Sequence, residues 1–208
     1  MTETSLLSQL RLLLQSDVHT IVQDRATSFH AIQQQPPDAL FLELCYCLLT
    51  ANCKADHCLT IQHTLGATFL HGTEHDIKDE LRNHHYRFPP RASRIIAARK
   101  HKDTLLSTLQ NLQGEDRRRW LVDTISGLGY KEASHFLRNI GFDDYAIIDT
   151  HILDLLTTHE VISPLRTLTP RRYLDIETKL RGIAQQAGLT LAELDLYLWH
   201  LETGKIIK

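Results

Sequence analysis

The sequence predicts an all-α fold. Along most of the 208-residue chain, apolar residues recur at the spacing of three and four residues that marks one face of a helix. The alternating apolar and polar pattern of a half-buried strand is missing. Prolines and glycines interrupt the helical pattern at five places, as expected between helices: Pro36-Pro37, Pro89-Pro90, Gly127 to Gly129, Gly141 and Ser163-Pro164.

Ten segments carry an apolar stripe at helical spacing and are expected to be helices. In chain order they are Leu6 to Leu14, Val18 to Ile32, Ala39 to Ala51, Cys58 to Leu70, Ala92 to His101, Trp120 to Ile125, Tyr130 to Ile140, Thr150 to Thr158, Pro170 to Ala187 and Leu191 to Leu201. The chain has no internal repeat and no low-complexity tract.

Composition is that of an ordinary globular protein. The chain is 42% hydrophobic and 23% charged, and its length is ample for a buried core. The start, Met1 to Thr4, is polar and acidic, without the basic and apolar regions of a signal peptide. The longest apolar stretch, Leu40 to Ala51, is too short to span a bilayer. We therefore expect a soluble, cytoplasmic protein with no membrane partner.

A tight turn, Gly127-Leu128-Gly129, separates two helical patterns, and glycine permits the positive φ angles that such a turn needs. After it, one buried helix face is marked by residues at i, i+3, i+4 and i+7, namely Ala133, Phe136, Leu137 and Ile140. Backbone N–H groups in such a turn and at the start of the next helix point outward together and can hold a phosphate. Gly127 and Gly129 are therefore candidate contacts with a nucleic-acid backbone.

An amine and a carboxylate stand eighteen residues apart, each at the start of a helix. Lys131 lies in the first turn after the glycines, and a neutral amine there could act as a nucleophile. The alternative for Lys131 is a solvated surface lysine. Asp149 could stabilise developing positive charge; the alternative for it is a helix N-cap and nothing more.

Resemblance to known proteins favours the catalytic interpretation. The run from Ile125 to Asn139 followed by Ile147 to Leu155 resembles the helix-hairpin-helix and Gly/Pro-Asp loop of the DNA glycosylase superfamily that includes endonuclease III. Three stretches resemble more closely its second, mainly archaeal class of 8-oxoguanine DNA glycosylase/lyases: Glu43 to Asn52, Gly129 to Asn139 and Glu193 to Trp199. The resemblance extends from about residue 20 to the last lysine.

The resemblance implies an architecture and an activity. It implies two helical subdomains, one of residues 1–56 and 140–208 and one of residues 57–139, with the active site in the cleft between them. Lys131 would attack the sugar of 8-oxoguanine nucleotides in double-stranded DNA, and Asp149 would assist. The expected protein is a monomer that needs no cofactor and works in the cell on chromosomal DNA.

Further residues gain roles through the same resemblance. Asn52 matches the position that fills the gap left by an extruded base; otherwise it would be a helix C-cap. Phe88 and Trp199 match aromatic residues that sandwich the flipped base, although either could be an ordinary core aromatic. Lys208 matches a lysine that reaches the base pocket, where a frayed tail would otherwise be expected.

The net charge of −2 is a mild argument against a nucleic-acid partner, but the basic residues are clustered. Residues 87–102 hold six lysines and arginines and no acidic residue, and Arg117 to Arg119 form a second cluster. Each cluster is either a solvated helix face or a DNA contact. Arg91 and Arg94, which follow the proline pair, are the expected phosphate contacts.

The four cysteines, Cys45, Cys47, Cys53 and Cys58, do not predict a metal site. They include no C-x-x-C pair, and the side chains of Cys45 and Cys47 diverge on a helix. Many endonuclease III relatives bind an iron–sulfur cluster through C-terminal cysteines, but no cysteine follows Cys58. The thirteen histidines form no HExxH motif, so neither zinc nor a cluster is expected.

Two other functions stay open on the sequence. An endonuclease III-like glycosylase for oxidised pyrimidines would share Lys131 and Asp149 but bind a different base. A non-catalytic helix-hairpin-helix protein would use Lys131 only to contact phosphate. Activity on duplexes with different lesions distinguishes the oxidised-pyrimidine glycosylase from an 8-oxoguanine glycosylase. Covalent trapping distinguishes an enzyme from the non-catalytic protein.

Overall fold

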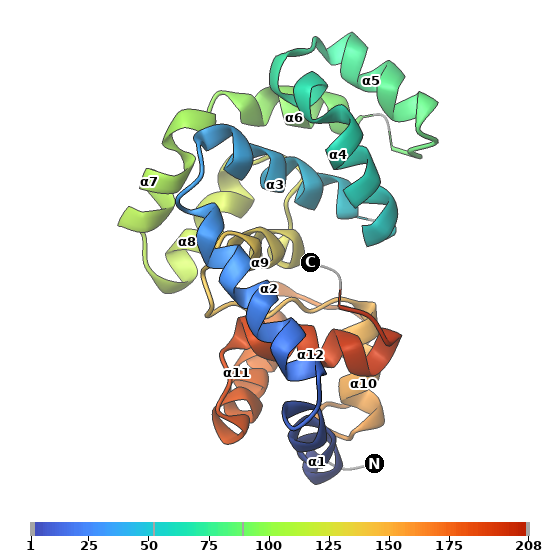
Figure 1. Cartoon of the computed structure of the whole chain (residues 1–208), viewed down its shortest axis with the longest axis vertical. Coiled ribbons are helices and arrows are strands. Elements are labelled where there is room, and N and C mark those ends of the chain that lie inside the picture. The colour runs from blue at the N-terminus through green and yellow to red at the C-terminus, as the bar shows by residue number, and fades with distance from the viewer. Residues whose placement is uncertain (1–2, 52, 89, 207–208) are drawn as a thin grey trace. The chain divides into compact units, whose positions relative to one another are not determined.

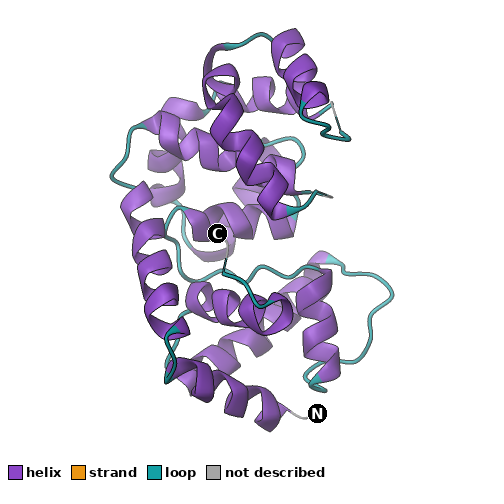
Figure 2. Ribbon diagram, turned by 45° about the vertical axis from the view of Figure 1, so that its right-hand side comes forward, coloured by secondary structure: helices purple, strands orange, loops and turns teal. Residues whose placement is uncertain are grey.

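The computed structural model describes residues 3–51, 53–88 and 90–206, and these ranges form an all-α protein. Twelve α-helices and one short 3₁₀ helix occur in the described residues, with no strand among them, as Figure 2 shows. The predicted fold class is therefore confirmed.

Most helices begin and end within a few residues of the predicted bounds. They are α1 (Glu3–Leu14), α2 (Val18–Ile32), α3 (Pro37–Thr50), α4 (Ala55–His71), α5 (Glu74–Asn83), α6 (Arg91–Arg99), η1 (Lys102–Thr104), α7 (Leu105–Asn111), α8 (Gly114–Thr124), α9 (Tyr130–Asn139), α10 (Thr150–Thr158), α11 (Pro170–Ala187) and α12 (Leu191–Thr203). The helices α5, η1, α7 and the first half of α8 were not predicted.

The chain divides into two compact units (Figure 1): residues 31–140 form a central unit, and residues 1–30 with 141–208 form a terminal unit. This division differs from the predicted subdomains at residues 31–56 and at Ile140, which the resemblance assigns to the terminal subdomain. Those residues belong to the central unit because α3 packs against α4, α6 and α9.

The helix α3 is the core of the central unit. From Leu40 to Thr50 every residue except Leu42 is buried, so this helix is apolar on nearly every side. Its one buried carboxylate, Glu43, accepts hydrogen bonds from Gln62 Nε2 and Asn139 Nδ2, each at 3.2 Å. These bonds satisfy a charge that would otherwise be expensive to bury, and they link α3 to α4 and α9.

In the terminal unit, α12 packs against α10 and α11, and α1 packs against α11. Two hydrogen bonds attach α2 to α12: His19 Nδ1 lies 2.7 Å from the Tyr197 hydroxyl, and Gln23 Nε2 donates to Glu193 Oε1 at 2.7 Å. Burial raises the pKa of the Tyr197 hydroxyl to about 12, so it stays protonated as a donor. This unit is thereby built from both ends of the chain.

The helix α5 was missed because its sequence is almost wholly polar, with only Ile77 and Leu81 buried. Its start nevertheless carries a capping box: Thr73 Oγ1 accepts from Asp76 N at 3.2 Å, and Asp76 Oδ2 accepts from Thr73 N at 2.8 Å. The hydrogen bonds from Thr73 lower the pKa of the Asp76 carboxyl.

Candidate active site

The predicted turn joins α8 and α9 in the central unit. Gly127 has a φ of +97°, a conformation that only glycine adopts without strain. The buried side chain of Leu128 anchors the turn, and its N–H donates to the carbonyl of Ile125 at 3.1 Å. Gly129 precedes α9 and is exposed, so the backbone N–H groups at the start of α9 lie at the surface.

Arg94, on α6, lies against this turn. A Cβ atom added to Gly127 would lie 2.6 Å from Cδ and 2.6 Å from Nη1 of Arg94. The arginine side chain is half-buried and brings a positive charge to the backbone of the turn. Of the predicted phosphate contacts, Arg94 and Gly127 are thus brought together, and together they offer a guanidinium group beside a helix N-terminus.

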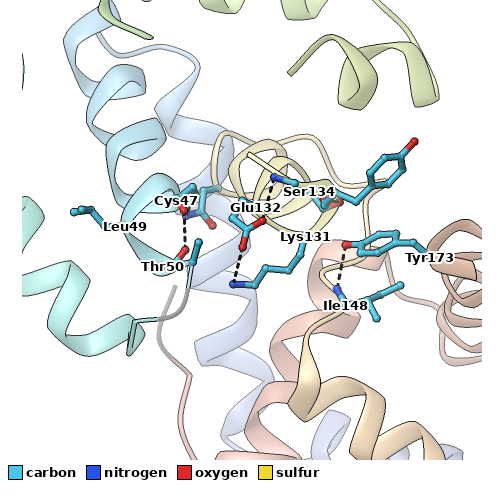
Figure 3. A network of polar contacts seen from close by, with 12 residues as sticks. Cys47, Leu49, Thr50, Lys131, Glu132, Ser134, Ile148 and Tyr173 are labelled. Atoms are coloured by element: carbon cyan, nitrogen blue, oxygen red, sulfur yellow. Dashed lines mark hydrogen bonds and ion pairs between the residues drawn. The ribbon is translucent and has the colours of Figure 1, made fainter. Parts of the chain in front are cut away.

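Lys131 is the second residue of α9, and its side chain is 24% exposed. Its Nζ lies 3.9 Å from Glu132 Oε1, while the other oxygen of Glu132 accepts from the N–H of Gly129 at 3.2 Å. Figure 3 shows the Lys131 and Glu132 side chains turned toward each other. Glu132 therefore binds both the amine and the backbone of the turn, which fixes the start of α9.

A buried thiol lies near Lys131. Burial raises the pKa of the Cys58 thiol, a hydrogen bond with Cys53 raises it further, and the charge of Lys131 offsets this only in part. Cys58 is fully buried and therefore stays a neutral thiol. Lys131 thus has a neutral group on this side, and among the described residues it forms an ion pair at long distance with Glu132.

Asp149 belongs to the terminal unit and directly precedes α10. Its Oδ1 accepts a hydrogen bond from Ile152 N at 3.0 Å, so the predicted N-cap is confirmed. Among the described residues, its second oxygen, Oδ2, has no hydrogen-bond donor. The cap therefore occupies half of the carboxylate and leaves the other half available for charge stabilisation.

The two predicted base-stacking residues lie in different units. Phe88 is 39% exposed, and its ring meets that of Tyr86 edge-on with centroids 6.1 Å apart. Trp199, on α12, meets the His151 ring edge-on at 5.3 Å, and its buried Nε1 has no hydrogen-bond partner in the part of the chain that the structure describes. Neither residue is a fully buried core aromatic.

Arg91 is more enclosed than a phosphate contact at the surface would be. It is 7% exposed, and its Nη2 donates to the carbonyl of Ala51 at 3.5 Å. Burial raises the pKa of the nearby Tyr86 hydroxyl, and Arg91 offsets this rise in part. Arg91 thus connects the start of α6 to the end of α3. The phosphate contact predicted for it stays a prediction.

Several other basic residues are used within the protein. Arg99 donates to the carbonyls of Phe69 at 2.6 Å and Gly72 at 3.0 Å, at the C-terminus of α4. Arg117 donates in the same way to the carbonyl of Leu109 at 2.7 Å, near the end of α7. Both arginines therefore bind carbonyl groups at helix C-termini within the protein. A DNA contact by either basic cluster stays a prediction.

Two predicted residues, Asn52 and Lys208, lie outside the described residues. Within the described ranges, no group of three or more histidine, cysteine or acidic side chains is placed to bind a metal ion, and the four cysteines are free thiols. The described helices also include none that is long and apolar enough to cross a membrane.

Comparison with known proteins decides the family. A family model for 8-oxoguanine DNA glycosylases with a helix-hairpin-helix matches residues 22–189. The chain belongs to the 8-oxoguanine DNA glycosylase family. The resemblance found in the sequence is thereby confirmed.

Relatives in this family match over nearly their whole length. An 8-oxoguanine DNA glycosylase/AP lyase of Methanocaldococcus jannaschii is 40% identical over 206 residues, covering 98% of this chain and 99% of its own. A protein of the same name from Korarchaeum cryptofilum is 42% identical over 196 residues, covering 93% of each chain. A crystal structure of the Methanocaldococcus jannaschii 8-oxoguanine glycosylase/lyase with a 15mer DNA containing 8-oxoguanine has a TM-score of 0.94 and 39% identity, covering 98% of this chain and 100% of that one.

Proposed function

We propose that this chain excises 8-oxoguanine from double-stranded DNA and then cleaves the strand at the abasic site, with Lys131 as the nucleophile. The observation that carries the proposal is the place of Lys131: a partly exposed amine on the first turn of α9, directly after a glycine turn, in a chain that matches its family over nearly its full length. The relatives named for both activities support the same conclusion.

The chemistry begins with a neutral amine. The lone pair of Lys131 Nζ attacks C1′ of the damaged nucleotide, the bond from C1′ to the base breaks, and the base leaves with a proton. The attacking nitrogen loses one of its two protons. The bond from C1′ to the ring oxygen O4′ then breaks, O4′ takes a proton from water, and the nitrogen keeps its second proton in a protonated Schiff base between Nζ and C1′. Loss of the 2′ proton then expels the 3′ phosphate by β-elimination, and water releases the lysine.

Asp149 supports this sequence electrostatically. Positive charge develops on the sugar as the base departs, and a carboxylate stabilises it. The capping bond to Ile152 holds one oxygen of Asp149, and the other oxygen can face the charge or accept the proton that Lys131 gives up. A fixed carboxylate is more effective here than a mobile one, because it needs no reorganisation during the reaction.

Recognition of the base is assigned to Phe88, Trp199 and Lys208. The two aromatic rings would stack on the extruded base, a contact worth about 1–3 kcal/mol per base. Oxidation replaces the N7 acceptor of guanine by an N–H donor. A hydrogen-bond acceptor of the protein at this position therefore pairs with 8-oxoguanine, but with guanine it would be left without a donor. Lys208 brings polar groups that can make this distinction.

We assign binding of the DNA backbone to the glycine turn and to two arginines of α6. Gly127, Gly129 and Arg94 would hold one phosphate, and Arg91, which is buried at the start of the helix that carries Arg94, would support that helix. Asn52 would enter the space left by the extruded base. We further propose that the protein acts as a monomer on chromosomal DNA, since one chain supplies all of these groups.

Borohydride trapping tests the proposal. The enzyme is mixed with a duplex that contains one 8-oxoguanine, and the Schiff base is reduced to a stable crosslink. Lys131→Gln should abolish trapping and strand cleavage while leaving duplex binding largely intact. Lys179→Gln is a matched control, because Lys179 is exposed and its Nζ donates to the carbonyl of Val161, far along the chain from the glycine turn.

The outcome also separates the alternative functions. Trapping that persists in Lys131→Gln would place the nucleophile elsewhere. Wild-type protein that binds DNA but never traps would be a non-catalytic DNA-binding protein. Cleavage of duplexes with oxidised pyrimidines in preference to 8-oxoguanine would assign the endonuclease III-like activity.

A further inference from the structure

The segment that leads to Asp149, residues 142–149, contains no helix or strand. Its first part is bound at Asp143 by His30 and by the N–H of Ala192, and the part nearer Asp149 is bound by α11. The hydroxyl of Tyr173 donates to the carbonyl of Ala146 at 2.7 Å and accepts from the N–H of Ile148 at 3.1 Å. Glu177 Oε2 accepts from the N–H of Ala146 at 2.8 Å. Figure 3 shows the bond between Tyr173 and Ile148, the residue before Asp149.

The spacing of these contacts fits both elements. Tyr173, Glu177 and Arg181 are four residues apart on α11 and advance about 6 Å per step along one face. Two residues of an extended chain advance about 6.6 Å. One turn of α11 therefore covers about the same distance as two residues of the segment. Arg181, one turn after Glu177, accordingly forms an ion pair with Asp144, two residues before Ala146.

These bonds are made away from water. Tyr173 is 2% exposed and Glu177 is 5% exposed, and the backbone of Ala146 and Ile148 is buried with them. A buried backbone group that loses its partner cannot turn to solvent instead. Tyr173 and Glu177 therefore hold the backbone of Ala146 and Ile148, the part of the segment nearest Asp149.

We propose that Tyr173 and Glu177 are positioning residues for the Asp149 carboxylate. This inference rests on the proposed catalytic role of Asp149. The two side chains fix the backbone of Ala146 and Ile148, and Ile148 is joined directly to Asp149, whose own capping bond then sets the carboxylate. Without them, Asp149 would still be present but its carboxylate would no longer be held in one place relative to the reacting sugar.

The first test is Tyr173→Phe, which removes both hydroxyl bonds and keeps the ring. We expect kcat on an 8-oxoguanine duplex to fall about 10- to 100-fold, as for a misplaced catalytic group, while KM stays near the wild-type value. Tyr197→Phe is the matched control: it removes a buried hydroxyl bond in the same unit, to His19, without touching the segment. Its kcat should equal that of the wild type.

A second pair of variants tests the proposal even if Tyr173→Phe is too unstable to assay. Glu177→Gln keeps an oxygen that can accept from Ala146 N, whereas Glu177→Ala does not. Glu177→Gln should therefore retain much more kcat than Glu177→Ala. Thermal melting of each variant shows that the folded protein is being assayed.

The deciding measurement is a double-variant cycle. If Tyr173 acts through Asp149, adding Tyr173→Phe to Asp149→Asn lowers kcat no further. Losses that multiply, or a Tyr173→Phe variant that turns over like Tyr197→Phe, would overturn the inference. Failure of the proposed function looks different, because wild-type protein would then neither cleave nor trap.

Discussion

Arg94 and Gly127 are in such close contact that a side chain on the glycine would have to displace the arginine. An added Cβ would lie 2.6 Å from two atoms of the arginine, and the φ of +97° at Gly127 already disfavours any other residue. Glycine is therefore favoured at position 127 for two separate reasons. It allows the turn between α8 and α9, and it allows the guanidinium group of α6 to reach that turn.

Gly127→Ala should impair both functions of this position. The left-handed backbone would strain an alanine, which lowers the free energy of unfolding by about 1–3 kcal/mol, and the new methyl group displaces Arg94. Denaturant unfolding and duplex titration measure the two effects. Gly114→Ala is the control, because Gly114 also has a positive φ, +48°, but has open space around it. Equal DNA affinity in the two variants would contradict a role for the Arg94 contact.

Arg94→Ala should weaken binding to any duplex, whether or not it contains a lesion. One phosphate contact fewer lowers the slope of log affinity against log salt concentration by about 0.9. The variant should fold normally, since no hydrogen bond of Arg94 within the described residues supports a helix end. Titrations at several salt concentrations give the slope, and an unchanged slope would remove Arg94 from the phosphate site.

Arg99→Ala should behave in the opposite way, although Arg99 lies only five residues along the same helix. Its removal leaves the carbonyls of Phe69 and Gly72 without their donor, which should lower the free energy of unfolding by about 1–3 kcal/mol. DNA affinity and its salt slope should stay at the wild-type values. A variant with normal stability and weak DNA binding would show that Arg99 contacts phosphate after all.

The contrast between Arg94 and Arg99 also shows what could and could not be predicted from the sequence. Apolar spacing located the helices with a long apolar face, because that spacing reflects the geometry of the helix itself. It missed α5 and α7, which bury only two apolar residues each, and the first half of α8, whose buried face contains charge. Arg118 of α8 is 1% exposed, lies 3.5 Å from Glu115 and sits over the ring of Tyr130, so the first half of that helix reads as polar.

In the candidate site, too, some features could be predicted from the sequence and others could not. Local chemistry predicted the turn at Gly127 and the cap at Asp149, because each depends on a few adjacent residues. Contacts between distant segments, such as Arg94 with Gly127 or Tyr173 with Ile148, leave no periodic signal. Charge clusters were misleading for a related reason: a guanidinium group that caps a helix looks in sequence like one that binds DNA.

Asp149→Asn should separate catalysis from folding. Asparagine caps a helix about as well as aspartate, so the free energy of unfolding should change little, while turnover falls about 10²- to 10³-fold with the loss of one electrostatic contact. Single-turnover rates and denaturant unfolding measure the two quantities. Thr73→Ala is the control: it removes the side-chain cap of α5 and should cost about 1 kcal/mol of stability with no loss of turnover. If Asp149→Asn turns over like the wild type, whether or not stability is lost, Asp149 is only a cap.

Deletion of Lys208 tests base recognition apart from catalysis. If Lys208 reads the base, its removal should reduce the preference for 8-oxoguanine over guanine, because one charge-assisted contact of about 1.5–3 kcal/mol is lost. That energy corresponds to about a 10- to 150-fold change in the ratio of kcat/KM values. Strand cleavage at a ready-made abasic site should be unaffected, since that substrate has no base to read. Equal losses on both substrates would instead assign Lys208 to the fold or to the DNA backbone, and no change on either would make it a tail without a role in recognition.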